Sequence, residues 1–244
     1  MLTRLGDYLI LMYQTFRVPD KMSVFRQQLN LQFAAIGLDS FVIVTIVSIF
    51  TGAISALQTA YNIDSPFIPL FMVGFTTRQM IILEFSPTVI SLILAGKVGS
   101  QIASEIGTMR VTEQIDALRA MGINPANYLI LPRIAAGLIF NPILIVFSIA
   151  ISLLGAWGAC AITGVVAPND FAHGLQSWFE PFSVYYALIK TVVFAFIISS
   201  VSGYLGYSVE GGSVEVGRAS TKAVVYASIL IIFFDLVLTQ LLLV

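Results

Sequence analysis

The chain is poor in charge, in cysteine and in histidine. Only 10% of its 244 residues are charged and 58% are hydrophobic, whereas a soluble domain carries about 25% charged residues. So little charge cannot cover a water-soluble globule, which indicates an integral membrane protein. The single cysteine excludes an intrachain disulfide, and the single histidine, His173, gives no metal-ligand cluster. The net charge of −1 provides no basic surface for nucleic acid.

The sequence also lacks the phosphate-binding motif of an ATPase. Gly96-Lys97 is followed by Val98 rather than by serine or threonine, and Ser91 stands where the motif requires glycine. Energy from ATP would therefore have to come from another chain. An intramembrane hydrolase is disfavoured as well, because His173 lies in a predicted loop and has no evident nucleophile to activate.

Long apolar runs, in contrast, are abundant. A run of about 20 residues is long enough to cross the hydrocarbon core of a bilayer. The sequence predicts an all-α integral membrane protein with five spans, at about 33–57, 67–98, 130–166, 182–207 and 223–244. No internal repeat is evident, so we expect one domain over residues 33–244.

Residues 1–32 contain too many charges for a span. Apolar side chains nevertheless recur at helical spacing on one face: Leu5, Leu9, Met12, Tyr13 and Phe16. This pattern favours an interfacial amphipathic helix with its apolar face in lipid. The alternative is a short cytoplasmic helix that packs on the protein itself.

Lysine and arginine predict the orientation of the spans. Ten of the twelve basic residues fall in residues 1–32, 97–133 and 208–222. The turn at 58–66 and the loop at 167–181 have none. Because basic residues concentrate on the cytoplasmic side, we expect a cytoplasmic N-terminus and a C-terminus outside.

The longest polar interval runs from Ala95 to Pro125, and we call it the elbow. Gly107 and Gly122 bracket a predicted helix at 108–121, with an apolar stripe at i, i+4 and i+7 formed by Val111, Ile115 and Leu118. Charged pairs at i, i+3 are expected between Arg110 and Glu113 and between Asp116 and Arg119. Upstream, small residues recur every fourth position and favour close helix packing: Ala95, Gly99, Ala103 and Gly107. The elbow helix either receives motion from a partner or is an ordinary connecting helix with a solvated face.

These residues carry a family resemblance. The stretch LAGKVGSQIASEIGTMRVTEQIDALRAMGINP, residues 94–125, resembles the signature of the MlaE/YrbE permease family. The sequences RASTKAVV at 218–225 and FDLVLT at 234–239 are similar to the C-terminal pattern of that family. The resemblance covers the chain from about Gln28 to its C-terminus.

The resemblance implies a homodimeric permease with an MlaE-type domain over residues 33–244. Such a permease is the membrane subunit of an ATP-binding-cassette (ABC) transporter that moves phospholipid between the inner and outer membranes. It would lie in the bacterial inner membrane and would not itself be an enzyme. ATP and Mg would bind to a partner ATPase, with no cofactor on this chain. Further implied partners are a periplasmic MCE-domain protein and a small STAS-like cytoplasmic subunit.

The resemblance also implies two sets of functional residues. The elbow would couple to the ATPase through Arg110, Glu113, Gln114, Asp116 and Arg119. Glu84-Phe85-Ser86-Pro87 resembles the Glu-Leu-Gly-Pro of the family, whose glutamate lies beside a lipid cavity at the dimer centre. The implied lipid-binding residues are Glu84, Phe85, Ser55, Gln58, Tyr61 and Ile63. Alternatively, Glu84 is a structural residue that is hydrogen-bonded between helices.

Two more ionisable residues lie within predicted spans, Lys190 and Asp235. They could pair across helices, or they could relay protons together with Glu84 in an ion-coupled secondary transporter. The absence of an internal repeat counts against that class. The simpler interpretation is that Lys190 snorkels to the membrane surface and that Asp235 makes an interhelical hydrogen bond. A non-transporting membrane anchor for a peripheral ATPase is a further alternative.

Overall fold

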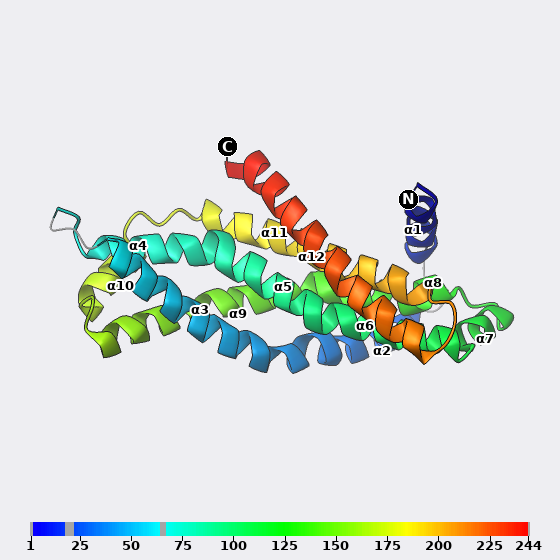
Figure 1. Ribbon diagram of the computed structural model, residues 1–244. Coiled ribbons are helices and arrows are strands. Elements are labelled where there is room, and N and C mark those ends of the chain that lie inside the picture. The colour runs from blue at the N-terminus through cyan, green and yellow to red at the C-terminus, as the bar shows by residue number, and fades with distance from the viewer. Residues whose placement is uncertain (1, 18–21, 64–66, 244) are drawn as a thin grey trace. The chain divides into compact units, whose positions relative to one another are not determined.

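The chain is mostly helical over the residues that the computed structural model describes, 2–17, 22–63 and 67–243 (Figure 1). No strand occurs among them, so the predicted all-α class is confirmed. The α-helices are α1 Leu2–Thr15, α2 Met22–Gln32, α3 Phe41–Asn62, α4 Phe71–Met80, α5 Ile90–Leu94, α6 Ser100–Val111, α7 Gln114–Ala120, α8 Pro125–Leu129, α9 Leu131–Thr163, α10 Pro168–Gln176, α11 Phe182–Tyr207 and α12 Ser213–Leu243. Shorter π or 3-10 segments lie between some of them, η1 Phe33–Gly37, η2 Leu38–Ser40, η3 Ile81–Val89 and η4 Ala95–Gly99.

Five continuous helical stretches in the described part of the chain are long and apolar enough to cross a membrane. They are Met22–Asn62, Phe71–Val111, Pro125–Thr163, Phe182–Tyr207 and Ser213–Leu243. The first three have 39 to 41 residues, or about 60 Å at ~1.5 Å per residue. The hydrocarbon core is only ~30 Å thick, so these helices continue beyond it. Hydropathy marks the part of a helix that lies in lipid, which explains why the predicted spans were shorter.

Two predicted loops are partly helical. The predicted loop 167–181 contains α10, which begins with Pro168 in its first turn and buries Phe171 completely. Proline is favoured at this position because its missing N–H is not needed there. Residues 208–222 were predicted as a polar interval, but α12 already begins at Ser213. The predicted turn at 58–66 lies only partly within the described residues.

Contacts along the chain define two compact units. Unit 1 consists of Met1–Ser40, Leu92–Asn141 and Val192–Gln240, and unit 2 of Phe41–Ser91, Pro142–Thr191 and Leu241–Val244. The elbow therefore belongs to unit 1, whereas all six predicted lipid-binding residues belong to unit 2.

Unit 2 is held together by backbone contacts at glycines and by a small apolar core. In α3 and α9, a Cβ on Gly52 would lie 1.9 Å from the Ser152 carbonyl oxygen. In α4 and α10, a Cβ on Gly174 would lie 2.0 Å from the Phe71 oxygen. Such contacts are typical of membrane helices that pack through small residues. The core residues are Ala56, Ala60, Val73, Ile81, Ala156, Cys160, Val166 and Phe171.

Unit 1 uses the predicted ladder of small residues for helix packing. Ala95 and Ala103 are fully buried. A Cβ on Gly206 of α11 would lie 2.7 Å from the Ala103 oxygen, and one on Gly99 would lie 3.0 Å from the Ser202 hydroxyl. The ladder therefore brings α6 and α11 close together.

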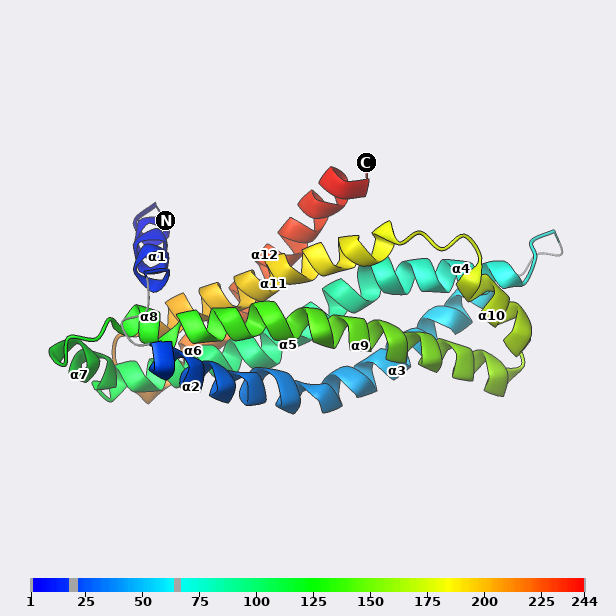
Figure 2. The same cartoon turned by 180° about the vertical axis from the view of Figure 1, so that it is seen from behind.

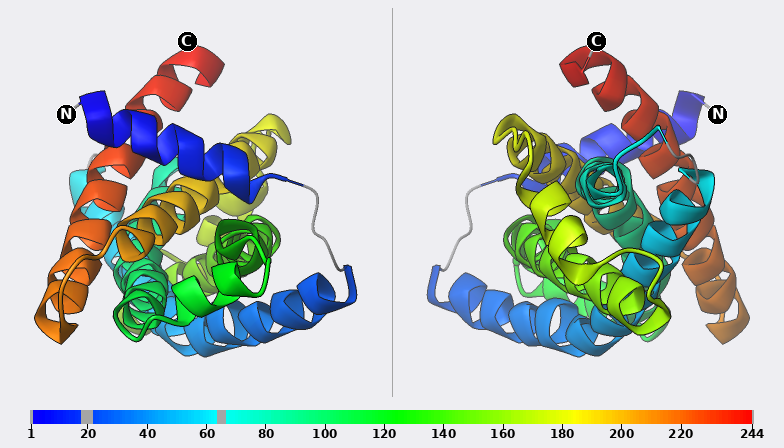
Figure 3. Two further views of the ribbon diagram at one scale, coloured as in Figure 1. Left: turned by 90° about the vertical axis from the view of Figure 1, so that its right-hand side faces the viewer. Right: turned by 90° about the vertical axis from the view of Figure 1, so that its left-hand side faces the viewer.

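Helix α1 also packs on α11 in unit 1 (Figure 3). The Tyr8 hydroxyl donates to Ser200 at 2.9 Å, and the Tyr8 ring meets that of Tyr204 edge to face. Most of the predicted lipid-facing side chains are exposed, but Met12 is buried against protein. The predicted apolar face is thus divided between protein and surroundings, and its interfacial location stays a prediction.

The close approach of α3 and α9 gives a first testable prediction. Gly52→Ala should destabilise the protein by about 1–3 kcal/mol, because its methyl group meets the Ser152 backbone. Gly158→Ala on α9 is the matched control, since nothing lies within 4 Å of its added Cβ. Alanine there should be neutral or slightly stabilising. The free energy of unfolding in mixed micelles would measure both, and equal values would contradict this packing.

Candidate functional site

Glu84 lies in a helix that proline has distorted. The segment η3 is π-helical and contains Pro87. Proline has no backbone N–H, and its ring clashes with the carbonyl four residues earlier, here that of Leu83. Widening of the helix relieves the clash, and π segments of this kind often occur at functional sites. The prediction that Pro87 distorts the helix beside Glu84 is therefore confirmed.

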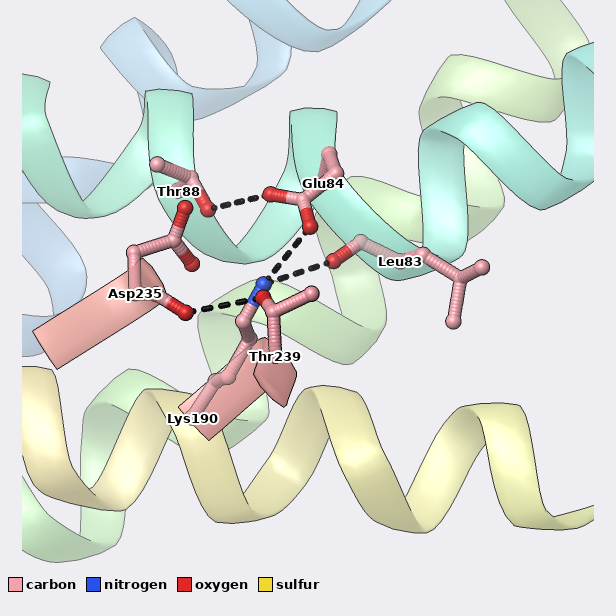
Figure 4. Close-up of polar contacts among 6 residues, drawn as sticks. All are labelled: Leu83, Glu84, Thr88, Lys190, Asp235 and Thr239. Carbon is pink, nitrogen blue, oxygen red and sulfur yellow. Dashed lines mark hydrogen bonds and ion pairs between the residues drawn. The ribbon is translucent and has the colours of Figure 1, made fainter. Parts of the chain in front are cut away.

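The charge partner of Glu84 is Lys190 of α11 (Figure 4). The Lys190 Nζ atom donates to Glu84 Oε1 at 2.9 Å and to the Leu83 carbonyl at 3.2 Å. The same Nζ atom lies 4.6 Å from the centre of the Tyr186 ring. The interpretation that Lys190 snorkels to the membrane surface is wrong, because its side chain is 0% exposed and its charge is used inside unit 2.

The two members of this ion pair differ in accessibility. The Glu84 side chain is 45% exposed, and its second oxygen accepts from Thr88 at 3.3 Å. A buried ammonium is costly unless it is paired and hydrogen-bonded. Lys190 thus holds one oxygen of Glu84 in place, while part of the carboxylate stays open to a polar ligand.

The other predicted lipid-binding residues differ in burial. Ser55 is buried and donates to the Thr51 carbonyl, whereas Gln58 and Tyr61 are exposed. Phe85 and Ile63 are partly buried and pack against the core of unit 2. Glu84, Gln58 and Tyr61 thus each present an accessible polar group, whereas Ser55 is buried.

Three serine hydroxyls form a hydrogen-bonded series next to this site, which was not predicted from the sequence. Ser48 of α3 donates to Ser148 of α9 at 2.8 Å, and Ser148 donates to Ser86 at 3.2 Å. All three are buried. The serine series connects α3, α9 and η3 of unit 2, and η3 is the segment that contains Glu84.

Arg78, in the last turn of α4, has a structural role. Its guanidinium donates to the carbonyl of Leu175 in the last turn of α10 at 2.5 Å, and to those of Ser177 at 3.0 Å and Trp178 at 3.2 Å. The guanidinium also lies over the rings of Phe75 and Phe179. Because the last carbonyls of a helix lack donors within it, Arg78 fixes the C-terminal end of α10 to α4.

The elbow differs from the single helix predicted at 108–121. Helix α6 continues through Gly107 to Val111. The helix is interrupted at Thr112 and Glu113, and α7 begins at Gln114. Gly107 is packed against Val209 rather than placed at a helix boundary. Glu113 adopts φ 61°, a left-handed conformation that costs a residue with a side chain about 1–2 kcal/mol.

The end of α7 was predicted correctly at Gly122. Its φ is 76°, its N–H donates to the Arg119 carbonyl, and the N–H of Ile123 donates to that of Leu118. This is the Schellman pattern, in which glycine takes the left-handed position. Asn124 then caps α8, with Pro125 in its first turn.

The charges of the elbow form a small exposed network. Asp116 pairs with Arg110 at 2.9 Å and with Arg119 at 3.7 Å. The expected Asp116–Arg119 pair is therefore confirmed, but Arg110 pairs with Asp116 rather than with Glu113. Arg119 also donates to the Tyr207 hydroxyl at 2.7 Å. In the predicted stripe, Ile115 is fully buried and Val111 and Leu118 are partly buried.

A second ion pair anchors the base of the elbow. Arg133 of α9 binds Glu105 of α6 at 2.8 Å and also donates to the Leu129 carbonyl. Gln101 donates to the other Glu105 oxygen at 2.9 Å. This group was not predicted from the sequence, although Gln101 and Glu105 lie one helical turn apart on α6, a spacing that indicates a shared polar face.

These features define the class of the protein. The described residues form five apolar helical stretches, and an ion pair joins two of these stretches. A short charged helix lies between two of them. The protein is thus a multi-pass membrane protein with polar groups buried among its helices, as in permeases. The family model described as Permease MlaE matches residues 29–241. The chain therefore belongs to the MlaE permease family, as the resemblance suggested.

Known proteins of three kinds are similar to this chain. A probable ABC transporter permease protein of Rickettsia prowazekii is 37% identical over 86% of this chain and 81% of its own length. The intermembrane phospholipid transport system permease protein MlaE of Haemophilus influenzae is 31% identical over 85% of this chain and 80% of its own. The chloroplastic protein TRIGALACTOSYLDIACYLGLYCEROL 1 of Arabidopsis thaliana is 36% identical over 64% and 45%. Together with the five apolar helices, the family indicates a multi-pass inner-membrane permease subunit and not a catalytic chain.

The Glu84–Lys190 pair generates a second prediction. Glu84→Gln and Lys190→Met should each destabilise the protein, and the double variant should lose less than the sum. We expect a coupling energy of about 0.5–3 kcal/mol, because the two groups share one interaction. The measurement is a double-mutant cycle on the free energy of unfolding in mixed micelles.

The matched control for this cycle is Lys222→Met combined with Glu84→Gln. Lys222 is exposed and belongs to unit 1. Its effect should simply add to that of Glu84→Gln. Additive effects of Glu84→Gln and Lys190→Met would show that the ion pair does not contribute to stability.

Proposed function

We propose that this chain is the permease subunit of an ABC transporter that moves phospholipid between the inner and outer membranes. The family and the printed function of the Haemophilus influenzae relative support the substrate class. In this proposal the chain acts as a homodimer in the inner membrane, with its N-terminus in the cytoplasm and its C-terminus in the periplasm. The distribution of lysine and arginine supports this orientation.

The observation that carries the proposal is the geometry of the elbow. A short helix, α7, lies between two long apolar helices and presents charged groups to its surroundings. The same charge distribution would place it in the cytoplasm, where a partner ATPase would bind. We therefore assign coupling to its polar residues Arg110, Glu113, Gln114, Asp116 and Arg119.

The proposed complex requires further chains. An ABC ATPase would bind ATP and Mg and dock on the elbow. A periplasmic MCE-domain protein would receive or deliver lipid, and a small STAS-like subunit would bind on the cytoplasmic side. The probable ABC transporter permeases among the relatives support the ATPase, and the family resemblance supports the other two.

The proposed lipid site centres on Glu84 at a cavity between the two subunits of the dimer. Its half-exposed carboxylate, held by the buried Lys190, could accept hydrogen bonds from a lipid headgroup. Gln58 and Tyr61 are accessible enough to join it, while Phe85, Ile63 and Ser55 would shape the wall. Family membership favours this ATP-driven permease over an ion-coupled transporter that uses Glu84 and Lys190.

The coupling role predicts a defect for Glu113→Lys in the reconstituted complex. Charge reversal at this exposed position should lower the amount of lipid moved per ATP hydrolysed by about fivefold or more. Glu113 is preferable to Arg119, because Arg119 also holds Tyr207. Lipid transfer between vesicles and phosphate release would be measured in the same samples.

Glu210→Lys is the control, since it makes the same charge change at another exposed position of unit 1. It should preserve the ratio of transport to hydrolysis. A Glu113→Lys complex that transports as much lipid per ATP as the unmodified complex would remove the coupling role from α7.

The lipid site predicts that Glu84→Ala reduces the phospholipid that copurifies with the complex. Removal of the carboxylate deletes the accessible polar group of the site, which we expect to weaken binding by about 1–3 kcal/mol. Mass spectrometry of the purified complex would measure bound lipid and would also identify the partner chains. Glu215→Ala on α12 is the control, because Glu215 is also partly buried and also pairs with a cation, Arg218. Equal lipid content in both variants would argue against the site.

A further inference from the structure

The C-terminal end of α1 is held by two asparagines, Asn124 at the end of the elbow and Asn127 in α8. A helix leaves its last four carbonyls without donors of its own. In α1 the carbonyl of Gln14 accepts from Asn124 Nδ2 at 3.0 Å, and that of Thr15 accepts from Asn127 Nδ2 at 2.8 Å. Asn127 Nδ2 also donates to the Arg17 carbonyl. Two side chains from the beginning of α8 thus supply donors to the end of α1. The ribbons of α1 and α8 lie close together in Figure 2.

Asn124 acts on two helices at once. Its Oδ1 atom accepts from the backbone N–H groups of Ala126 at 3.1 Å and Asn127 at 3.5 Å, and thereby caps the N-terminus of α8. Its Nδ2 atom donates to α1. Aspartate or serine can cap a helix N-terminus in this way, but only an amide offers an acceptor and an NH₂ donor on one planar group. The residue type at this position therefore matches its double contact.

The connection from α7 to these asparagines is short. Helix α7 ends at Ala120, and the Schellman turn at Gly122 leads directly to Asn124. Asn127 follows within the first turn of α8 and is itself buried. No flexible linker separates the elbow helix from the groups that bind α1.

We propose that Asn124 and Asn127 are positioning residues that fix α1 to the elbow, so that α1 moves with α7 when the ATPase acts. This inference rests on the proposed coupling role of α7. In this proposal, movement of the elbow displaces α1 as well as the membrane spans that the elbow connects. We call the two asparagines and the α1 carbonyls of Gln14, Thr15 and Arg17 the clasp.

The exposed face of α1 indicates what a displaced α1 would contact. Most side chains that α1 and the residue after it leave exposed are large and apolar, with Asp7 and Gln14 as the polar exceptions. The apolar ones are Leu5, Leu9, Ile10, Tyr13 and Phe16. A helix with such a face binds at the boundary between headgroups and acyl chains. Through the clasp, a displacement of α7 would therefore shift an apolar helix at the lipid surface beside the transporter.

The test uses the reconstituted complex with Asn124→Asp and, separately, Asn127→Leu. Asn124→Asp keeps the oxygen that caps α8 and loses the donor to α1, whereas Asn127→Leu removes two donors without adding charge. Lipid moved per ATP hydrolysed should fall about fivefold in both, while the complex still assembles and hydrolyses ATP. Asn169→Asp, at an exposed position of α10, is the control for the added charge and should behave like the unmodified complex.

A purely structural role would lower assembly, hydrolysis and transport together, so the ratio of transport to hydrolysis is the decisive readout. If Glu113→Lys uncouples the complex but both clasp variants keep the normal ratio, the clasp inference is wrong and the coupling role stands. If Glu113→Lys also keeps the normal ratio, the coupling role itself fails.

A distance measurement tests the clasp independently of transport. Spin labels at Leu9 and Met121, both exposed, would be introduced into a Cys160→Ala background of the assembled complex. The distance between them should be the same without nucleotide and with trapped ATP, and Asn127→Leu should broaden its distribution. A Leu9–Met121 distance that changes with nucleotide in the protein with an intact clasp would overturn the proposal.

Discussion

Backbone carbonyls that a helix leaves without a donor are the constraint on which this structure depends. In a bilayer no water can satisfy them, and buried carbonyls at helix ends outside the spans need partners as well. Here the partners are side chains from other helices or from the next turn. Lys190 serves the carbonyl beside the Pro87 distortion, Arg78 the end of α10, Arg133 the end of α8, and the two clasp asparagines the end of α1.

This constraint explains why three cations of the described residues, Arg78, Arg133 and Lys190, are buried. A buried cation is costly alone, but a carbonyl and a carboxylate together offset that cost. Lys190 and Arg133 each bind one backbone carbonyl and one carboxylate. A cation committed to a carbonyl is fixed in position, and the carboxylate that it binds is fixed with it. The function proposed for Glu84 therefore depends on a structural need that Pro87 creates.

Features encoded over a few residues could be predicted from the sequence, and long-range partnerships could not. The five apolar helices follow from hydropathy, and the end of α7 follows from Gly122 and Pro125. Lys190 lies 106 positions from Glu84, and no local pattern signals their contact. The residues 167–181 were missed as a helix because their composition is polar. Yet Pro168 and the i, i+4 pair Phe171 and Leu175 were signals that could have predicted α10.

In the proposed mechanism, movement of the elbow would be transmitted along two routes, which differ in their hydrogen bonding. Towards Glu84, the route follows one helix from Val111 back through η4 and then into η3, so it crosses two π-helical segments. Their wider turns interrupt the regular hydrogen bonds along that helix. Towards α1, the route is a short turn followed by direct hydrogen bonds to a helix end. In the proposed mechanism, a displacement of α7 would therefore act on α1 through direct hydrogen bonds, whereas it would reach Glu84 only along a helix with two π-helical segments. Repositioning of α1 is thus the more direct consequence that we propose for movement of the elbow.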